Sequence, residues 1–117
     1  MIDFACKRFS LDEVIKCGLG LTKADYTLLM YLIDHNEEWQ TTAFLAKETR
    51  LDQSTVQRSM KKLHEKEIVE KAQENLSGGG YTFIYKAKNK EHIKEIIVGI
   101  INNWSSHTVS QVEKWAA

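Results

Sequence analysis

The chain has 117 residues, which is enough for one domain with a single hydrophobic core and too few for two independent domains. Charged residues make up 27% of the sequence and hydrophobic residues 43%, which argues against a disordered class and against a membrane class. The N-terminus lacks the hydrophobic core of a signal peptide, so we expect a cytoplasmic protein with no membrane partner.

The charge is zero in total, with 16 basic and 16 acidic residues, but it is unevenly distributed. Between residues 41 and 90, ten basic residues stand against six acidic ones, so this part is positive and its flanks are negative. A protein whose basic part is gathered in one motif can bind a polyanion despite a neutral sum. Because the local excess is modest, we expect one copy alone to bind weakly.

Two short helices are predicted in the first third of the chain. Residues 1–9 are expected to be a loosely structured lead-in whose aromatic side chains lie on the core. Ser10 followed by Glu13 predicts the start of a helix that ends at the glycines of 18–20. A second helix is predicted to start at Thr22. Its expected buried positions are Tyr26, Leu29, Met30 and Ile33.

The stretch from Thr41 to Val69 predicts two further helices joined by a tight turn. A short strand is expected just before it at Trp39–Gln40. The first helix of the pair spans about Thr42–Thr49 and is expected to bury Phe44 and Leu45. The turn that follows should direct the second helix across the first.

The second helix of the pair runs from Gln53 to about Lys66 and is amphipathic. Asp52 is a good N-cap for it, and its inward side is predicted to carry Val56, Met60 and Leu63. A row of hydroxyl, amide and cationic groups on the opposite side can reach base edges and hold phosphates. That outer side carries Ser54, Gln57, Arg58, Lys61, Lys62 and Glu65.

Two strand-like runs, Val69–Gln73 and Tyr81–Ala87, flank the sequence ENLSGGG, whose glycines favour a hairpin turn. The tip of this hairpin has no Lys or Arg. A helix-turn-helix followed by such a hairpin is the order of a winged helix-turn-helix, in which one helix is presented to a DNA groove. The predicted fold class is therefore α+β and mostly helical.

The chain is predicted to be helical again from about Glu91, and this segment carries more apolar surface than a small core can cover. The helix either shifts its apolar register or breaks near Ser105–Ser106. We therefore divide the chain into a DNA-binding domain (residues 1–90) and a C-terminal helical dimerisation segment (residues 91–117). The expected dimerisation stripe consists of Ile93, Ile97, Ile100 and Trp104.

Five motifs between residues 21 and 87 carry a family resemblance: Leu45-Ala46, Ser54–Arg58, Lys61–Leu63, Lys66–Val69 and the aromatic strand after the glycines. With these motifs, residues 21–87 resemble the winged-helix regulators of the MarR and TrmB type, including short archaeal TrmB-like proteins. The resemblance implies a homodimer that binds a pseudo-palindromic site in double-stranded DNA, with one recognition helix in each major groove.

By position, the resemblance implies which residues face DNA. Arg58 and Gln57 are the expected base contacts. The other expected contacts are Ser54, Thr55, Lys61 and Lys62 on phosphates, with Ser77 and Gly79 of the wing near the backbone. The resulting prediction is a sequence-specific transcriptional regulator, more often a repressor than an activator, whose effector is unknown.

Two alternatives remain open. One is a protein–protein module within a larger complex, and the other is a MarR-like sensor of a small molecule or of thiol oxidation. Cys6 and Cys17 could carry a thiol switch, although Cys17 lies beside an apolar face, where cysteine usually behaves as a small hydrophobe. The four histidines are scattered and no catalytic motif appears, so we predict no metal, no cofactor and no enzyme activity.

Overall fold

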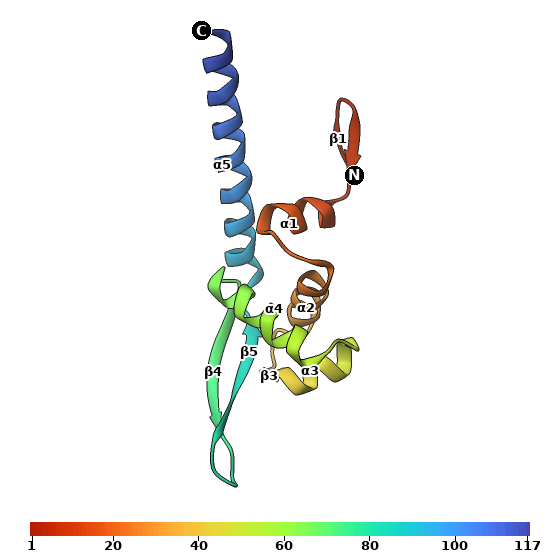
Figure 1. Cartoon of the computed structure of the whole chain (residues 1–117), viewed down its shortest axis with the longest axis vertical. Coiled ribbons are helices and arrows are strands. Elements are labelled where there is room, and N and C mark those ends of the chain that lie inside the picture. The colour runs from red at the N-terminus through yellow and green to blue at the C-terminus, as the bar shows by residue number, and fades with distance from the viewer.

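The computed structural model describes all 117 residues, in five helices and two small antiparallel sheets (Figure 1). The α+β, mostly helical architecture with a long C-terminal helix is confirmed. The elements in chain order are β1 (Ile2–Phe4), β2 (Lys7–Phe9), α1 (Leu11–Leu19), α2 (Lys23–Asp34), β3 (Gln40–Thr41), α3 (Thr42–Thr49), α4 (Gln53–Glu65), β4 (Val69–Asn75), β5 (Tyr81–Ala87) and α5 (Lys90–Ala116).

The molecule is elongated, with extents of 67 × 24 × 23 Å. Its radius of gyration is 17.6 Å, whereas a compact chain of this length would have about 13 Å. The β4–β5 hairpin projects at one end of the long axis, and the C-terminal half of α5 projects at the other (Figure 1). Both segments therefore extend beyond the core.

The core is formed where α2, α3 and α4 pack against one another and against β5. Leu45 of α3 and the predicted inward residues of α4 (Val56, Met60, Leu63) are fully buried, which confirms both assignments. The predicted face of α2 is only partly right. Leu29 is buried as expected, but the other buried apolar positions are Leu28 and Leu32, because α2 contacts α3, α4 and β5 together. Tyr26, Met30 and Ile33 are half-buried at its edge.

The helix starts follow their predicted caps. The Ser10 hydroxyl accepts a hydrogen bond from the Glu13 backbone N–H, and Gly20 ends α1 in the left-handed region at φ 67°. Thr22 and Asp25 form the reciprocal capping box of α2. Asp52 occupies the N-cap position of α4, but its side chain makes no capping hydrogen bond.

Two expectations for the N-terminal half are wrong. Residues 1–9 form a hairpin, not a loose lead-in, and Phe4 is 68% exposed instead of lying on the core. Phe44 is also exposed, because α3 buries only the side on which Leu45 lies and Phe44 is turned about 100° away from it.

The second sheet has the strand order β3-β5-β4. The predicted strand at Trp39–Gln40 lies one residue later, and Gln40 is paired with Tyr85. β4 extends to Asn75, opposite Tyr81, so the hairpin is two residues longer on this strand than predicted. A winged helix-turn-helix is thus complete from α2 to β5.

The helix α5 continues without a break through Ser105–Ser106. Ile93 is only 4% exposed and belongs to the core of its own domain, while Ile97 and Ile100 are half-buried against that core. Trp104 is 66% exposed. The apolar stripe of α5 therefore begins inside the fold and leaves it, which removes Ile93 from any surface open to a partner.

The packing of α2 gives a first prediction. Leu28→Ala should destabilise the protein by about 2–5 kcal/mol, because the side chain is fully buried and its removal leaves a cavity. Urea unfolding measures the change. Leu11→Ala removes an equivalent but 61% exposed side chain and should change stability by less than about 1 kcal/mol; equal losses in the two variants would contradict the observed face of α2.

Candidate nucleic-acid interface

The outward side of α4 is the candidate interface. Because its inward residues repeat every three or four positions, one side is fixed against the core and the opposite side faces solvent. Four of the six residues predicted on this helix are exposed together there: Ser54, Gln57, Arg58 and Lys61. These residues form a polar and basic row, which we call the α4 row.

Thr55 lies at the margin of the α4 row and is half-buried. Its hydroxyl accepts a hydrogen bond from Nη2 of Arg58 at 3.5 Å. The guanidinium thus has a weak local partner on its own helix and keeps most of its donors free. The predicted contact of Thr55 with DNA stays a prediction.

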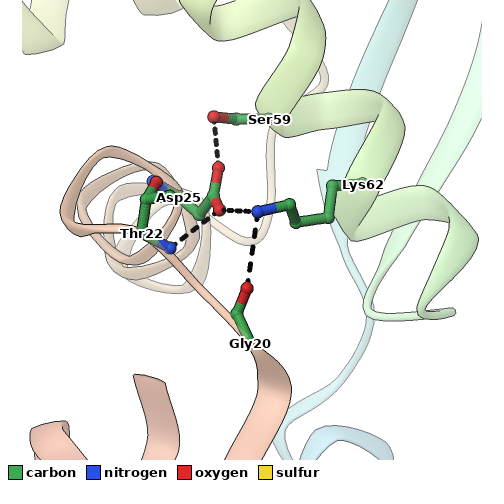
Figure 2. A network of polar contacts seen from close by, with 5 residues as sticks. All are labelled: Gly20, Thr22, Asp25, Ser59 and Lys62. Atoms are coloured by element: carbon green, nitrogen blue, oxygen red, sulfur yellow. Dashed lines mark hydrogen bonds and ion pairs between the residues drawn. The ribbon is translucent and has the colours of Figure 1, made fainter. Parts of the chain in front are cut away.

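Lys62 is not part of the α4 row. Its Nζ donates to Oδ2 of Asp25 at 2.6 Å and lies 3.4 Å from the carbonyl oxygen of Gly20 (Figure 2). The side chain therefore points toward the α1–α2 junction. Because the charge of Lys62 is paired with a carboxylate that is 3% exposed, we leave Lys62 out of the α4 row, and its predicted phosphate contact stays a prediction.

Asp25 is the centre of this polar network, which the sequence did not predict. Its Oδ2 also accepts from the Thr22 backbone N–H at 2.9 Å, and its Oδ1 accepts from the Ser59 hydroxyl (Figure 2). Burial alone would raise the pKa of Asp25, but the hydrogen bonds from Lys62, Ser59 and Thr22 outweigh it and lower the pKa below its usual value. Asp25 is therefore a charged carboxylate that connects α2 to α4.

One signal could have revealed this network. Ser59 lies three residues after Val56 and four before Leu63, on the inward side of an otherwise apolar pattern. A small polar residue at such a position needs a hydrogen-bond partner inside the protein. In this structure it is 3% exposed and that partner is Asp25.

Two exposed cations adjoin the α4 row from the preceding helix and turn. Lys47 lies on α3, and Arg50 ends that helix in the left-handed region at φ 60°. Arg50 lies in the turn that joins α3 to α4, three residues before the first residue of α4 and two before the exposed Asp52. It therefore places a cation near the end of the helix where Ser54 lies.

The other predicted sites lie apart from the α4 row. Ser77 and Gly79 are exposed in the tip of the β4–β5 hairpin, where Gly79 has φ 95°. Cys6 in the N-terminal hairpin and Cys17 on α1 are both exposed and form no disulfide. Cys17 is thus not a buried small hydrophobe. The thiol switch stays a prediction.

The fold and the α4 row define a winged-helix protein, and a family match makes this specific. Residues 9–108 match the DnaD N-terminal domain family, so the chain belongs to that family. The winged-helix class that the resemblance implied is confirmed, while the MarR or TrmB subtype stays a prediction. None of the helices is long and apolar enough to cross a membrane.

Three relatives illustrate this similarity. A protein described as a possible transcriptional regulator from Methanosarcina mazei is 47% identical, with a TM-score of 0.95 over 100% of this chain and 98% of that one. The uncharacterized protein MJ1503 of Methanocaldococcus jannaschii is 26% identical, covering 93% of this chain and 81% of its own length. The MepR–DNA complex of S. aureus shares the fold, with a TM-score of 0.55 and 16% identity over 89% of this chain and 85% of that one.

The Asp25 network gives a second prediction. Asp25→Asn should destabilise the protein by about 1–3 kcal/mol, since it leaves Lys62 without its anion and weakens the bond to Ser59. The pKa of Asp25 is lower in the folded than in the unfolded chain. Its ionised form therefore contributes fully to the free energy of unfolding above the unfolded pKa of about 3.9, and this contribution is lost as the pH falls through the folded pKa.

Urea unfolding between pH 7 and pH 3 measures this dependence. The difference in free energy of unfolding between the native protein and Asp25→Asn should be constant above about pH 5 and shrink below about pH 4. Asp34→Asn changes an exposed carboxyl at the end of the same helix and is the control. A difference that persists unchanged to pH 3 would contradict a charged, stabilising Asp25.

Proposed function

We propose that the protein is a DNA-binding transcriptional regulator that acts as a homodimer, with α4 as its recognition helix. The observation that carries this proposal is the α4 row, in which amide, guanidinium and ammonium groups are exposed together on a helix held by a complete winged-helix core. The description of the Methanosarcina mazei protein and the MepR–DNA complex support the same function.

The residue types of the α4 row suit the major groove. Arg58 can donate two hydrogen bonds to the O6 and N7 atoms of guanine, and Gln57 can pair with the N6 and N7 atoms of adenine. Ser54 and Lys61, which flank them along the helix, suit phosphate oxygens. Lys47 and Arg50 add attraction for the backbone at the start of the helix.

The homodimer is proposed from the projecting half of α5. In steps of four, four and three residues, Trp104, Thr108, Val112 and Trp115 continue the stripe that Ile93, Ile97 and Ile100 begin in the core. The exposed fractions of Trp104, Val112 and Trp115 are 66%, 56% and 85%. Water is a poor environment for such a stripe, and a helix without packing is only marginally stable. A second copy of the same stripe would cover it with two-fold symmetry.

A dimer would compensate for the weak DNA binding expected from one chain with a neutral net charge. One copy offers few phosphate contacts, whereas two copies double them and require a two-fold DNA site. A dimer that occupies such an operator would obstruct transcription, so we propose repression, in the cytoplasm, as the biological outcome. The bare wing tip favours one competing function, a winged-helix module that binds protein in a larger complex.

Arg58 tests the DNA contact. On a site selected from random duplexes, Arg58→Ala should weaken binding by about 10- to 100-fold and relax specificity at one base pair in each half-site. Arg58→Lys keeps the charge but loses the planar guanidinium, which can donate two hydrogen bonds to one base. It should therefore lose specificity while retaining the salt dependence of binding. Fluorescence anisotropy between about 50 and 200 mM salt measures the affinity and its salt dependence. No binding by the native protein at low salt would favour the protein-binding module.

Trp104 tests the dimer. Trp104→Glu should shift the protein from dimer to monomer in sedimentation equilibrium, because a buried carboxylate would oppose pairing of the stripes. Its circular dichroism should still show a folded winged-helix domain. Asn102→Glu introduces the same charge on the opposite side of α5, at an exposed position, and is the matched control. A native protein that is monomeric at all concentrations would contradict the homodimer.

A further inference from the structure

The two faces of the β4–β5 hairpin differ in chemistry. The strand register places Lys71 opposite Tyr85, Gln73 opposite Phe83 and Asn75 opposite Tyr81, so these residues share one face. At the base of the hairpin the same face carries Val69, Tyr85 and Ala87, which are buried in the core. The face that packs on the helices therefore continues beyond them as an exposed surface. We call Lys71, Gln73, Tyr81 and Phe83 the aromatic face of the wing.

The acidic residues of the hairpin lie on the opposite face. Alternation places Glu70 and Glu74 there, with Glu70 directly opposite Lys86 in the register. The aromatic face carries no carboxylate. A polyanion that approached the aromatic face would therefore contact only cationic or neutral groups, whereas on the other face it would be repelled by acidic groups.

Lys71 is held in place on the aromatic face. Its Nζ lies 3.9 Å from the centroid of the Phe83 ring, and the Phe83 ring meets Tyr81 edge-on at 5.4 Å. No carboxylate forms a salt bridge with Lys71. A cation over an aromatic ring keeps its hydrogen-bond donors available, and the contact restricts a side chain that would otherwise be flexible.

We propose that the wing contacts the DNA backbone through its aromatic face and not through its tip. Lys71 binds a phosphate, Phe83 positions the Lys71 ammonium, and the Tyr81 hydroxyl lies on the same face to donate to a neighbouring phosphate. This inference rests on the proposed insertion of α4 into the major groove. The face that continues the helix-packed side of the sheet would then lie toward the flanking backbone, where the hairpin projects past the helices (Figure 1).

A matched pair of variants tests the proposal on the selected duplex. Lys71→Gln and Lys86→Gln remove the same charge from opposite faces of one hairpin. Lys71→Gln should weaken binding on the order of 3- to 10-fold at about 0.15 M salt and reduce the slope of log K against log salt by about 1.8, because each copy in the proposed dimer loses one phosphate contact worth about 0.9. Lys86→Gln should stay within about twofold and keep the slope. Equal effects of the two variants would overturn the proposal.

Phe83 separates positioning from charge. Phe83→Leu keeps every cation yet should weaken binding, whereas Phe83→Trp keeps an aromatic face under Lys71 and should restore it. Ser77→Ala separates the two predictions for the wing: the sequence predicts weaker binding because Ser77 lies near the backbone, whereas the aromatic-face proposal predicts unchanged affinity. Loss of binding in Ser77→Ala with native affinity in Lys71→Gln would overturn the assignment to the aromatic face.

Two further outcomes are distinguishable. If the native protein binds no duplex, the proposed function fails, and the backbone contact by the wing, which rests on it, fails as well. If the native protein binds duplex with a contribution from Arg58, but Lys71→Gln and Lys86→Gln behave alike, only the role of the wing fails. A single-stranded oligonucleotide bound as tightly as duplex, and released by Phe83→Leu, would assign the aromatic face to unpaired bases and overturn the backbone contact.

Discussion

The Asp25 carboxylate receives hydrogen bonds from two helices that are far apart in the sequence. It closes the first turn of α2 with Thr22, and it binds Ser59 and Lys62 on α4. Apolar packing alone holds α4 against the core but fixes its rotation about its own axis less strictly than directional hydrogen bonds do. Because the exposure of the α4 row depends on that rotation, the Asp25 network acts with the buried Val56, Met60 and Leu63 to fix which side chains α4 presents to solvent. The same contacts keep Lys62 out of the row.

The position of α5 connects the fold to the proposed dimer. Its first turn is anchored in the core by Ile93, and its C-terminal half leaves the domain with its apolar stripe uncovered. A rigid helix that begins in one core and pairs with a second copy would fix the separation of the two α4 helices. In the proposed assembly, recognition by α4 and backbone contacts by the wing would each be doubled, which compensates for the neutral net charge of one chain.

Local signals allowed most of the fold to be predicted. Apolar periodicity placed α3 at its observed bounds, and strand alternation did the same for β5. Long-range contacts were not predictable in this way. Lys62 lies at the edge of the outer face of α4, so only the position of Asp25, 37 residues earlier, decides its direction.

The N-terminal hairpin was missed because three-residue strands carry too little pattern. The exposure of Ser54, Gln57, Arg58 and Lys61 was predictable from helical spacing, while their contact with DNA stays a prediction.

Hydroxyl-radical footprinting of a selected duplex tests most directly whether two α4 helices act together. Two copies joined along α5 should protect two backbone patches related by two-fold symmetry, separated by one helical turn of about 34 Å or a multiple of it, on one face of the DNA. Protection of a single patch, at protein concentrations where the complex is saturated, would contradict a dimeric regulator. Absence of any protection would contradict DNA binding by the α4 row itself.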